Sequence, residues 1–313
     1  KLQSIDLVTD MPVFRWDIDK TYLETDFESL SGLWKAATEE AEEKKTTDGV
    51  VTLVHALQDI NDARMVFLSG SPKQMRSVLL EKFSLDGVDV DDIILKDSLG
   101  AIAKGRFSDV KNQFGHKLPS LLEHRLTVQD LSCGQVEYLF GDDVEQDALI
   151  YLTYQLILNG QLQWKEVKRL MRKGGALNSA IARTRESFSK LKSSQDVVRG
   201  TFIRLTKHLI PNWMYGLMPH IIPVHTWSQA GAKLWSDGII GEAALRQICL
   251  DEGTTPIQFA NLIQDLQLRG LITREKAMSL LKVMGTEERY FFEGNSPQPL
   301  TFSNVFQAFR GVS

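Results

Sequence analysis

The feature that most constrains the fold is a regular alternation of short apolar runs and helical segments in the first half of the 313-residue chain. Strand-like runs lie at residues 11–19, 65–68, 93–95 and 136–140. Apolar residues at helical spacing lie at residues 49–59, 74–83, 117–124 and 147–158. Strands that alternate with helices form βαβ units, so the sequence predicts an α/β, Rossmann-like core with a mostly parallel sheet.

The pattern changes near residue 161. Turn residues such as Pro211, Gly231 and Gly270 separate segments with helical spacing, and no clear strand run stands out among them. We therefore expect two domains. Residues 1–160 would form the α/β domain, and residues 161–313 would form an all-helical domain whose role the sequence does not reveal.

Bulk composition narrows the class of protein. A formal net charge of −4 does not suggest general affinity for nucleic acid. No apolar run reaches the ~18–20 residues that a membrane span needs. Cys133 and Cys249 lie far apart and form no CxxC pair, which fits a reducing compartment or simply no requirement for a disulfide. The expected location is cytoplasmic, with membrane association as a further possibility. The chain begins with Lys1 rather than Met, so a removed signal peptide stays an open alternative.

Polar residues follow three of the expected strands. Asp17 and Asp19 follow the first, Ser69 the second, and the pair Asp142 and Asp143 the fourth. Binding sites of parallel α/β sheets lie at the carboxyl ends of the strands. We expect these side chains to gather at one edge and form a site.

The residue types suit hydrolysis of a phosphate ester. That reaction needs a carboxylate nucleophile, an acid/base group, a cation and donors for the phosphoryl oxygens. Asp17 is the expected nucleophile and Asp19 the acid/base group. Mg²⁺ prefers oxygen ligands, which Asp17, the backbone carbonyl of Asp19, and Asp142 would supply. Ser69 and Lys117 would bind the phosphoryl group, and either Asp143 or Asp147 would complete the acidic end of the fourth strand.

Each of these features also has a simpler interpretation. Asp-x-Asp and Gly-Asp-Asp are common in solvated turns, Ser69 lies in a Ser-Gly-Ser-Pro turn, and Lys117 alone is typical of a protein surface. Their order favours the site, because each one follows an apolar strand or opens a helix.

Five segments together carry a family resemblance. They are Trp16-Asp17-Ile18-Asp19-Lys20-Thr21, Phe67-Leu68-Ser69-Gly70-Ser71-Pro72, Ile94-Leu95-Lys96-Asp97, His116-Lys117-Leu118, and Phe140-Gly141-Asp142-Asp143 through Asp147-Ala148-Leu149-Ile150-Tyr151. In order and approximate spacing, residues 13–151 resemble the haloacid dehalogenase (HAD) superfamily of phosphatases. Within it, they are most similar to the catalytic domains of actin-patch-associated phosphatidate phosphatases and their bacterial relatives.

The resemblance implies the same roles for Asp17, Asp19, Ser69 and Lys117, and a metal-ligand role for Asp142. It matches Asp147 to the second acid of the last segment, with Asp143 as the competing choice. Three departures stand out. Lys20 replaces a third Asp of these relatives, no aromatic residue follows Pro72, and no clear fifth strand follows Tyr151.

The resemblance also indicates how a substrate would reach the site. HAD phosphatases select substrates largely through cap insertions, and neither residues 22–64 nor residues 72–116 hold a large cap domain. An open site is therefore implied, suited to a bulky substrate or covered by the helical half.

Two segments of the second half invite a membrane interpretation. Residues 165–192 hold nine Lys or Arg and two Glu, which suits phospholipid headgroups or another polyanion, or else a solvated helix face. Trp213, Met214, Tyr215, Leu217, Met218 and Trp227 would either meet a membrane interface or pack in a core.

The leading hypothesis is a Mg²⁺-dependent phosphomonoesterase that forms an aspartyl-phosphate and acts on phosphatidate or a similar lipid phosphate. A second hypothesis replaces the lipid by a soluble ester or a phosphoprotein. A third, non-enzymatic hypothesis is a binding module with this fold and no turnover, supported by Lys20 alone. The expected partner is a phosphorylated substrate with peripheral membrane contact, and no nucleic acid is expected.

Overall fold

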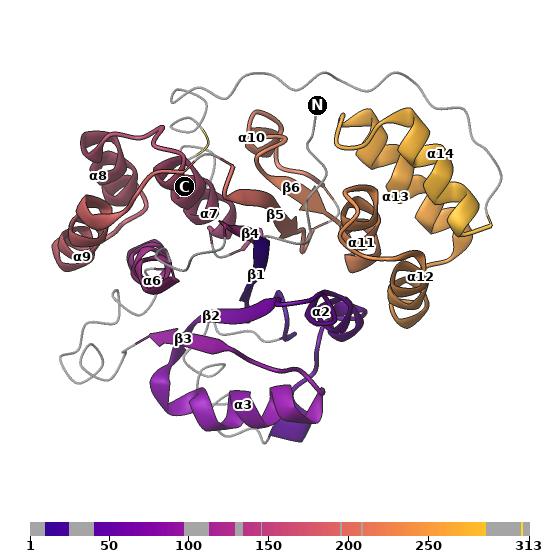
Figure 1. The fold of residues 1–313 in the computed structure, drawn as a ribbon, viewed down its shortest axis with the longest axis horizontal. Helices are drawn as coiled ribbons and strands as arrows, with labels where there is room; N and C mark the ends of the chain where they lie inside the picture. Colours follow the sequence, from indigo (N-terminus) through magenta and orange to yellow (C-terminus); the bar gives the residue numbers. More distant parts are fainter. Residues whose placement is uncertain are drawn as a thin grey trace.

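A single six-stranded sheet organises the molecule (Figure 1). The computed structural model describes residues 10–24, 41–96, 113–128, 134–144, 146–194, 196–207, 209–285 and 308. The strands are β1 (Asp10–Asp17), β2 (Arg64–Pro72), β3 (Asp92–Lys96), β4 (Gly134–Asp142), β5 (Val198–Arg204) and β6 (Ile222–Val224). Their order is β3-β2-β1-β4-β5-β6, and every neighbouring pair is parallel. The predicted Rossmann-like α/β fold is confirmed.

The order of the strands creates a switch point at the centre of the sheet. From β1 the chain proceeds to β2 and β3 on one side, then crosses to β4 and continues to β5 and β6 on the other. The carboxyl ends of β1 and β4 therefore lie side by side, where crossovers leave in opposite directions. Ligands of open α/β sheets bind in the crevice at such a point.

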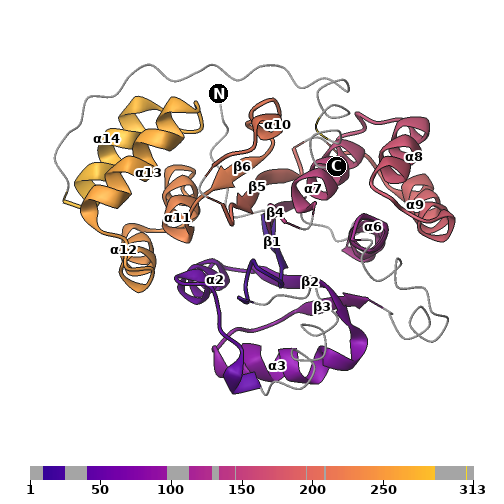
Figure 2. The same ribbon diagram turned by 180° about the vertical axis from the view of Figure 1, so that it is seen from behind.

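Helices cover both faces of the sheet (Figures 1 and 2). One face packs against α6 (Phe114–Val128), α7 (Asp147–Leu158), α8 (Trp164–Lys173) and α9 (Asn178–Lys190). The other face packs against α2 (Val50–Gln58), α3 (Arg76–Leu85), α11 (Trp227–Ser236), α12 (Glu242–Asp251), α13 (Pro256–Leu268) and α14 (Arg274–Val283). Short helices complete the described part: η1 (Ala41–Glu43), η2 (Lys73–Met75) and α10 (Asn212–Tyr215). Both apolar faces of the strands are thus buried, as a parallel sheet requires.

The expectation that residues 161–313 are all helical needs a correction, because β5 and β6 lie there. β5 escapes notice because Arg199 and Gly200 interrupt its apolar residues. β6 has three residues and contains Pro223, which is tolerated because β6 is the edge strand. The fifth strand missed after Tyr151 is therefore present. The domain boundary near residue 160 stays a prediction, although hydrogen bonds of the sheet continue past it through β5.

Two further expectations meet the structure only partly. The sequence also predicts a charged helix at residues 34–45; most of that segment lies outside the described residues, and its described part contains η1. Of the six residues named above in the segment 213–227, four are buried, namely Met214, Leu217, Met218 and Trp227, while Trp213 is half-buried and Tyr215 is exposed. Among the described helices, none is both long enough and apolar enough to cross a membrane.

Candidate active site

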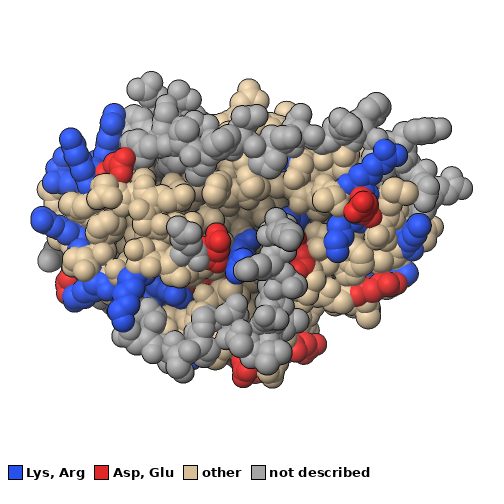
Figure 3. Space-filling view, turned by 45° about the horizontal axis from the view of Figure 1, so that its top comes forward, with Lys and Arg blue, Asp and Glu red and all other residues tan. Residues whose placement is uncertain are grey.

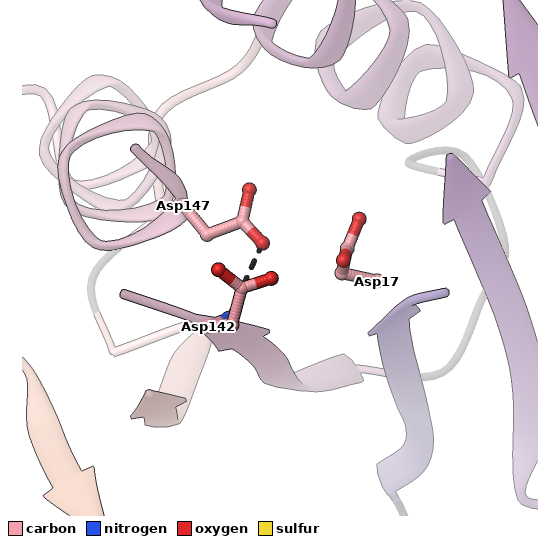
Figure 4. A group of neighbouring side chains, drawn as sticks. All are labelled: Asp17, Asp142 and Asp147. Carbon is pink, nitrogen blue, oxygen red and sulfur yellow. Dashed lines mark hydrogen bonds between the residues drawn. The ribbon is translucent and has the colours of Figure 1, made fainter. Parts of the chain in front are cut away.

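Three carboxylates meet at the switch point of the sheet (Figure 4). Asp17 ends β1, Asp142 ends β4, and Asp147 is the first residue of α7. One oxygen of each lies within 4.8 Å of the others, and all three residues are buried. The backbone N–H of Asp142 donates to Oδ2 of Asp147 at 3.4 Å. Such a cluster of buried oxygen donors fits a hard divalent cation.

Gly141 permits the approach of α7 to β4. A Cβ atom at this position would lie 2.6 Å from Oδ2 of Asp147 and 2.8 Å from the ring of Tyr151. Neither neighbour is a loose surface chain, because both are buried at the start of α7. The absence of a side chain at Gly141 therefore lets Asp147 reach the ends of β1 and β4.

Lys117 bridges two of the three carboxylates. It extends from the first turns of α6, and its Nζ lies 2.5 Å from Oδ1 of Asp17 and donates to Oδ1 of Asp147 at 2.6 Å. The side chain is fully buried. One ammonium thus lies among three carboxylates. A divalent cation bound beside Lys117 would reduce the mutual repulsion of these carboxylates.

Asp19 lies in a second polar group at the end of β2. The hydroxyl of Ser69 donates to Oδ2 of Asp19 at 2.8 Å, and the hydroxyl of Ser71 lies 3.5 Å from the same oxygen. The backbone N–H of Ser71 donates to Oγ of Ser69 at 2.9 Å. These hydrogen bonds join the loop after β1 to the end of β2. The hydroxyls of Ser69 and Ser71 are groups that can donate to a phosphoryl oxygen.

His116 supports this second group from α6. Its Nε2 lies 3.0 Å from the carbonyl oxygen of Ser69, which only accepts, so Nε2 carries the proton. Burial, reinforced by the positive charge of Lys96, lowers the pKa of His116 to about 3. The ring is therefore neutral at physiological pH and fixes the distance between α6 and β2.

Asp143 points away from the cluster. Its Oδ1 accepts hydrogen bonds from the backbone N–H of Thr206 at 2.9 Å and from the Thr206 hydroxyl at 2.8 Å. Of the two acids that the sequence left open after Asp142, the structure brings Asp147 to Asp17 and ties Asp143 to the chain beyond β5.

The loop after β1 is held by residues from the second half of the chain. Nη1 of Arg204, at the end of β5, donates to the carbonyl of Lys20 at 3.1 Å. Lys20 has a φ of 62°, an uncommon conformation for a side chain other than Gly. Arg204 was not foreseen, because its strand was not recognised. Recognition of β5 would have placed it at the carboxyl edge.

A hydrogen-bonded chain ties the same loop to α11. The hydroxyl of Thr21 lies 3.5 Å from Oδ2 of Asp142, and its carbonyl accepts from the hydroxyl of Thr47 at 2.8 Å. Nε1 of Trp227 donates to Oγ1 of Thr47 at 2.8 Å. The Trp227 ring also packs against Trp16, with centroids 5.5 Å apart. No motif at Thr47 or Trp227 signalled this role.

A buried ion pair underlies the acidic cluster. Arg15 lies two residues before Asp17, and its Nε lies 2.6 Å from Oε2 of Glu137 on β4. The hydroxyl of Tyr154 donates to the same carboxylate at 2.8 Å, and Arg125 of α6 donates to it at 3.0 Å. Burial alone would raise the pKa of Glu137, yet Arg15 holds it below its ordinary value. These bonds anchor α6 and α7 to the strands that carry the site.

The fold and the site together define a class: a Rossmann-like α/β enzyme with an acidic, cation-compatible centre at its switch point. Residues 16–163 match the family model for the catalytic domain of phosphatidate phosphatase APP1. This part of the chain is thus related to APP1 catalytic domains, and the resemblance noted in the sequence is confirmed. The match covers somewhat less than half of the chain. No curated protein and no solved structure matches the chain.

The matched segment contains all the residues that the sequence singled out for the site, from Asp17 to Asp147. It ends before β5 and therefore excludes Arg204, Thr206 and Trp227. The match makes this segment similar to the catalytic domain of a phosphatase. The contacts from β5 and α11 are features of this chain that the family match does not describe.

Proposed function

We propose that the protein is a Mg²⁺-dependent phosphomonoesterase that acts through an aspartyl-phosphate on phosphatidate or another lipid phosphate. The observation that carries the proposal is Lys117, bridging Asp17 and Asp147 within a cluster that also holds Asp142. The family match of residues 16–163 supports a lipid phosphate as the substrate.

In the first step, a carboxylate oxygen of Asp17 attacks phosphorus, and the bond from phosphorus to the ester oxygen breaks. Asp19 gives its proton to that leaving oxygen. In the second step, water attacks phosphorus, Asp19 takes the proton, and the bond to Asp17 breaks, which releases phosphate. Ser69 and Lys117 donate to the phosphoryl oxygens throughout.

The cation would be held by Asp17 and Asp142, with the backbone carbonyl of Asp19 as a further ligand. Asp147 serves as the additional acid, since Asp143 is bonded to Thr206. Bound Mg²⁺ would offset the repulsion between the carboxylates and the phosphate. The buried, oxygen-only donor set of the cluster supports this choice of ion.

The hydrolysis of two substrates tests the proposal. Wild-type protein and Asp17→Asn are each given an aryl phosphate in solution and phosphatidate in vesicles, with Mg²⁺ or with a chelator. We expect Mg²⁺-dependent release of phosphate by the wild type, a preference for phosphatidate, and loss of turnover in Asp17→Asn, whose amide is no nucleophile.

The alternatives predict different results. A preference for the soluble ester, or for a phosphoprotein, would replace the lipid as substrate and leave the chemistry in place. Absence of turnover by the wild type with any divalent metal would favour a binding module of this fold. Substantial turnover by Asp17→Asn would show that Asp17 is not the nucleophile. A cytoplasmic enzyme that contacts membranes peripherally fits the leading proposal.

A further inference from the structure

Helices α8 and α9 form a strongly basic hairpin, which we define as residues 164–192. It contains nine Lys or Arg and two Glu, in a chain whose formal net charge is −4. Most of the nine cations are exposed. Figure 3 shows Lys and Arg gathered at the end of the molecule where α8 and α9 lie, on the left in the view.

The two glutamates of the basic hairpin are already engaged. The side chain of Glu166 caps the start of α8 by accepting from the backbone N–H of Gln163 at 2.7 Å. Glu186 pairs with Lys190 at 2.7 Å on the exposed side of α9. One further acid, Glu123 of α6, pairs with Arg183 at 2.6 Å. By sequence, nine Lys or Arg and two Glu give the hairpin a formal net charge of +7.

The turn of the basic hairpin lies at the same edge of the sheet as the acidic cluster. Gly174, which ends α8, packs so closely on α6 that a Cβ atom there would lie 2.8 Å from the ring of Phe114. Phe114 opens α6, three residues before Lys117. The last turn of α8, with Arg172 and Lys173, therefore lies near the start of α6 and near the edge that holds the site.

An exposed apolar residue follows this turn. Leu177 precedes α9 and is 42 % exposed, beside Gly175, which has a φ of 79°. The neighbouring Arg172 is exposed too. An exposed apolar side chain at the turn of a basic hairpin suits the boundary of an anionic bilayer, where it enters the acyl region while the cations meet lipid phosphates.

We propose that the basic hairpin docks the protein on anionic lipid bilayers, with residues 174–177 at the interface. Docking there would turn the carboxyl edge of the sheet toward the membrane. The inference deepens the proposed function, since it says how the site reaches a lipid phosphate. The purpose of docking rests on the proposed function, but docking itself is tested separately, because membrane binding is measured without turnover.

Flotation of the full chain with vesicles tests the proposal. The vesicles consist of phosphatidylcholine alone or of its mixture with phosphatidylglycerol. The double variant Arg172→Gln and Lys173→Gln removes the two positive charges in the last turn of α8. Its control, Arg274→Gln with Lys276→Gln, removes the same charge from α14 on the opposite face of the sheet. Leu177→Ser removes the apolar tip at constant charge.

We expect binding to the anionic vesicles only, weakened by salt. Each cation near such a surface contributes roughly fivefold, so the hairpin pair lowers partitioning by roughly 25-fold and the control pair leaves it nearly unchanged. Leu177→Ser lowers it at least about threefold. The proposal would be overturned if the protein bound neutral vesicles as strongly as anionic ones, or if the control pair lost as much binding as the hairpin pair. Binding to an RNA oligonucleotide without any vesicle binding would also overturn it.

Hydrolysis of a soluble aryl phosphate, assayed in parallel, separates this proposal from the catalytic one. Vesicle binding that requires the hairpin, in a protein without turnover, would keep the docking surface and reject the proposed function. Turnover that is unaffected in the hairpin pair, with no vesicle binding by the wild type, would reject the docking surface alone.

Discussion

At the end of β4, two consecutive aspartates have opposite environments. Asp142 is buried against Asp17 and Asp147, whereas Asp143 is half-buried and accepts two hydrogen bonds from Thr206. Their sequence context is almost the same, since both follow the strand directly. The environment, not the residue type, decides which acid can serve a cation.

The two residues therefore make a matched pair of variants. Asp142→Asn should lower the apparent affinity for Mg²⁺ at least about tenfold, or about 1.4 kcal/mol, because a charged ligand is lost. Asp143→Asn should leave it unchanged, since the amide oxygen still accepts from Thr206. Titration of activity with Mg²⁺ measures both. A larger effect at Asp143 would reverse the assignment.

His124 of α6 should make the free energy of unfolding depend on pH. Arg15 donates to its Nδ1 at 2.9 Å, so the ring is neutral. Burial, together with the charge of Arg15, lowers its pKa to about 4. An unfolded histidine titrates near 6.5, so the contribution of the neutral ring is complete above that pH and is lost as the pH falls toward 4.

Acidification from pH 7 to pH 5 should cost the wild type about 2 kcal/mol through His124. His124→Asn keeps an acceptor for Arg15 and does not titrate, so its free energy of unfolding should fall by that much less. Urea unfolding at the two pH values measures the difference. An identical fall in both proteins would mean that His124 is not held neutral.

At the residue scale, the sequence predicted which side chains gather but not their final partners. Asp17, Asp19, Ser69, Lys117 and Asp142 do lie at one edge, because parallel strands end there together. The choice between Asp143 and Asp147 depended on Gly141 and on the first turn of α7, which spacing alone does not reveal. Their catalytic roles remain predictions.

Among the elements, the closest approach at the site is that of β4 and α7 at Gly141. Gly141→Ala should displace Asp147 and weaken the binding of Mg²⁺ about 10- to 100-fold, the range for disturbed support of a metal ligand. Gly241→Ala is the control, because a Cβ atom there meets nothing within 4 Å and its φ is −84°. Isothermal titration with Mg²⁺ compares them, and equal affinities would contradict this account.

The elements of the first half were predictable because their apolar runs are continuous or helically spaced. β5 and β6 were not, since Arg199 and Gly200 interrupt one and Pro223 shortens the other. Because β5 was not predicted, Arg204 and its hydrogen bond to Lys20 were not predicted either. Long-range pairing decides such short strands, and local sequence carries little of that information.

For the whole molecule, β5 and α11 link the two halves of the chain. Phe202 stacks on Phe140 with ring centroids 5.1 Å apart, and Trp227 covers Trp16. A fragment that ends at residue 163 would expose these rings and leave β4 as an open edge. Exposed edges and apolar faces promote aggregation.

We therefore expect the fragment 1–163 to be insoluble or to lack a cooperative thermal transition. The full chain, which keeps β5, β6 and α11–α14, is the control and should remain soluble with a cooperative transition. Sedimentation and thermal melting test both. A soluble, cooperatively melting 1–163 fragment would establish an independent domain that ends near residue 160.

The central position of β4 has a consequence for synthesis on the ribosome. Domains begin to fold as the amino-terminal part emerges, at about 5–20 residues per second. β5 follows β4 only after helices α7, α8 and α9, so the edge of β4 that faces away from β1 would stay unpaired for roughly several seconds. During that interval the open edge of β4 could pair with another chain, so the arrival of β5 ends a period of exposure to misassembly.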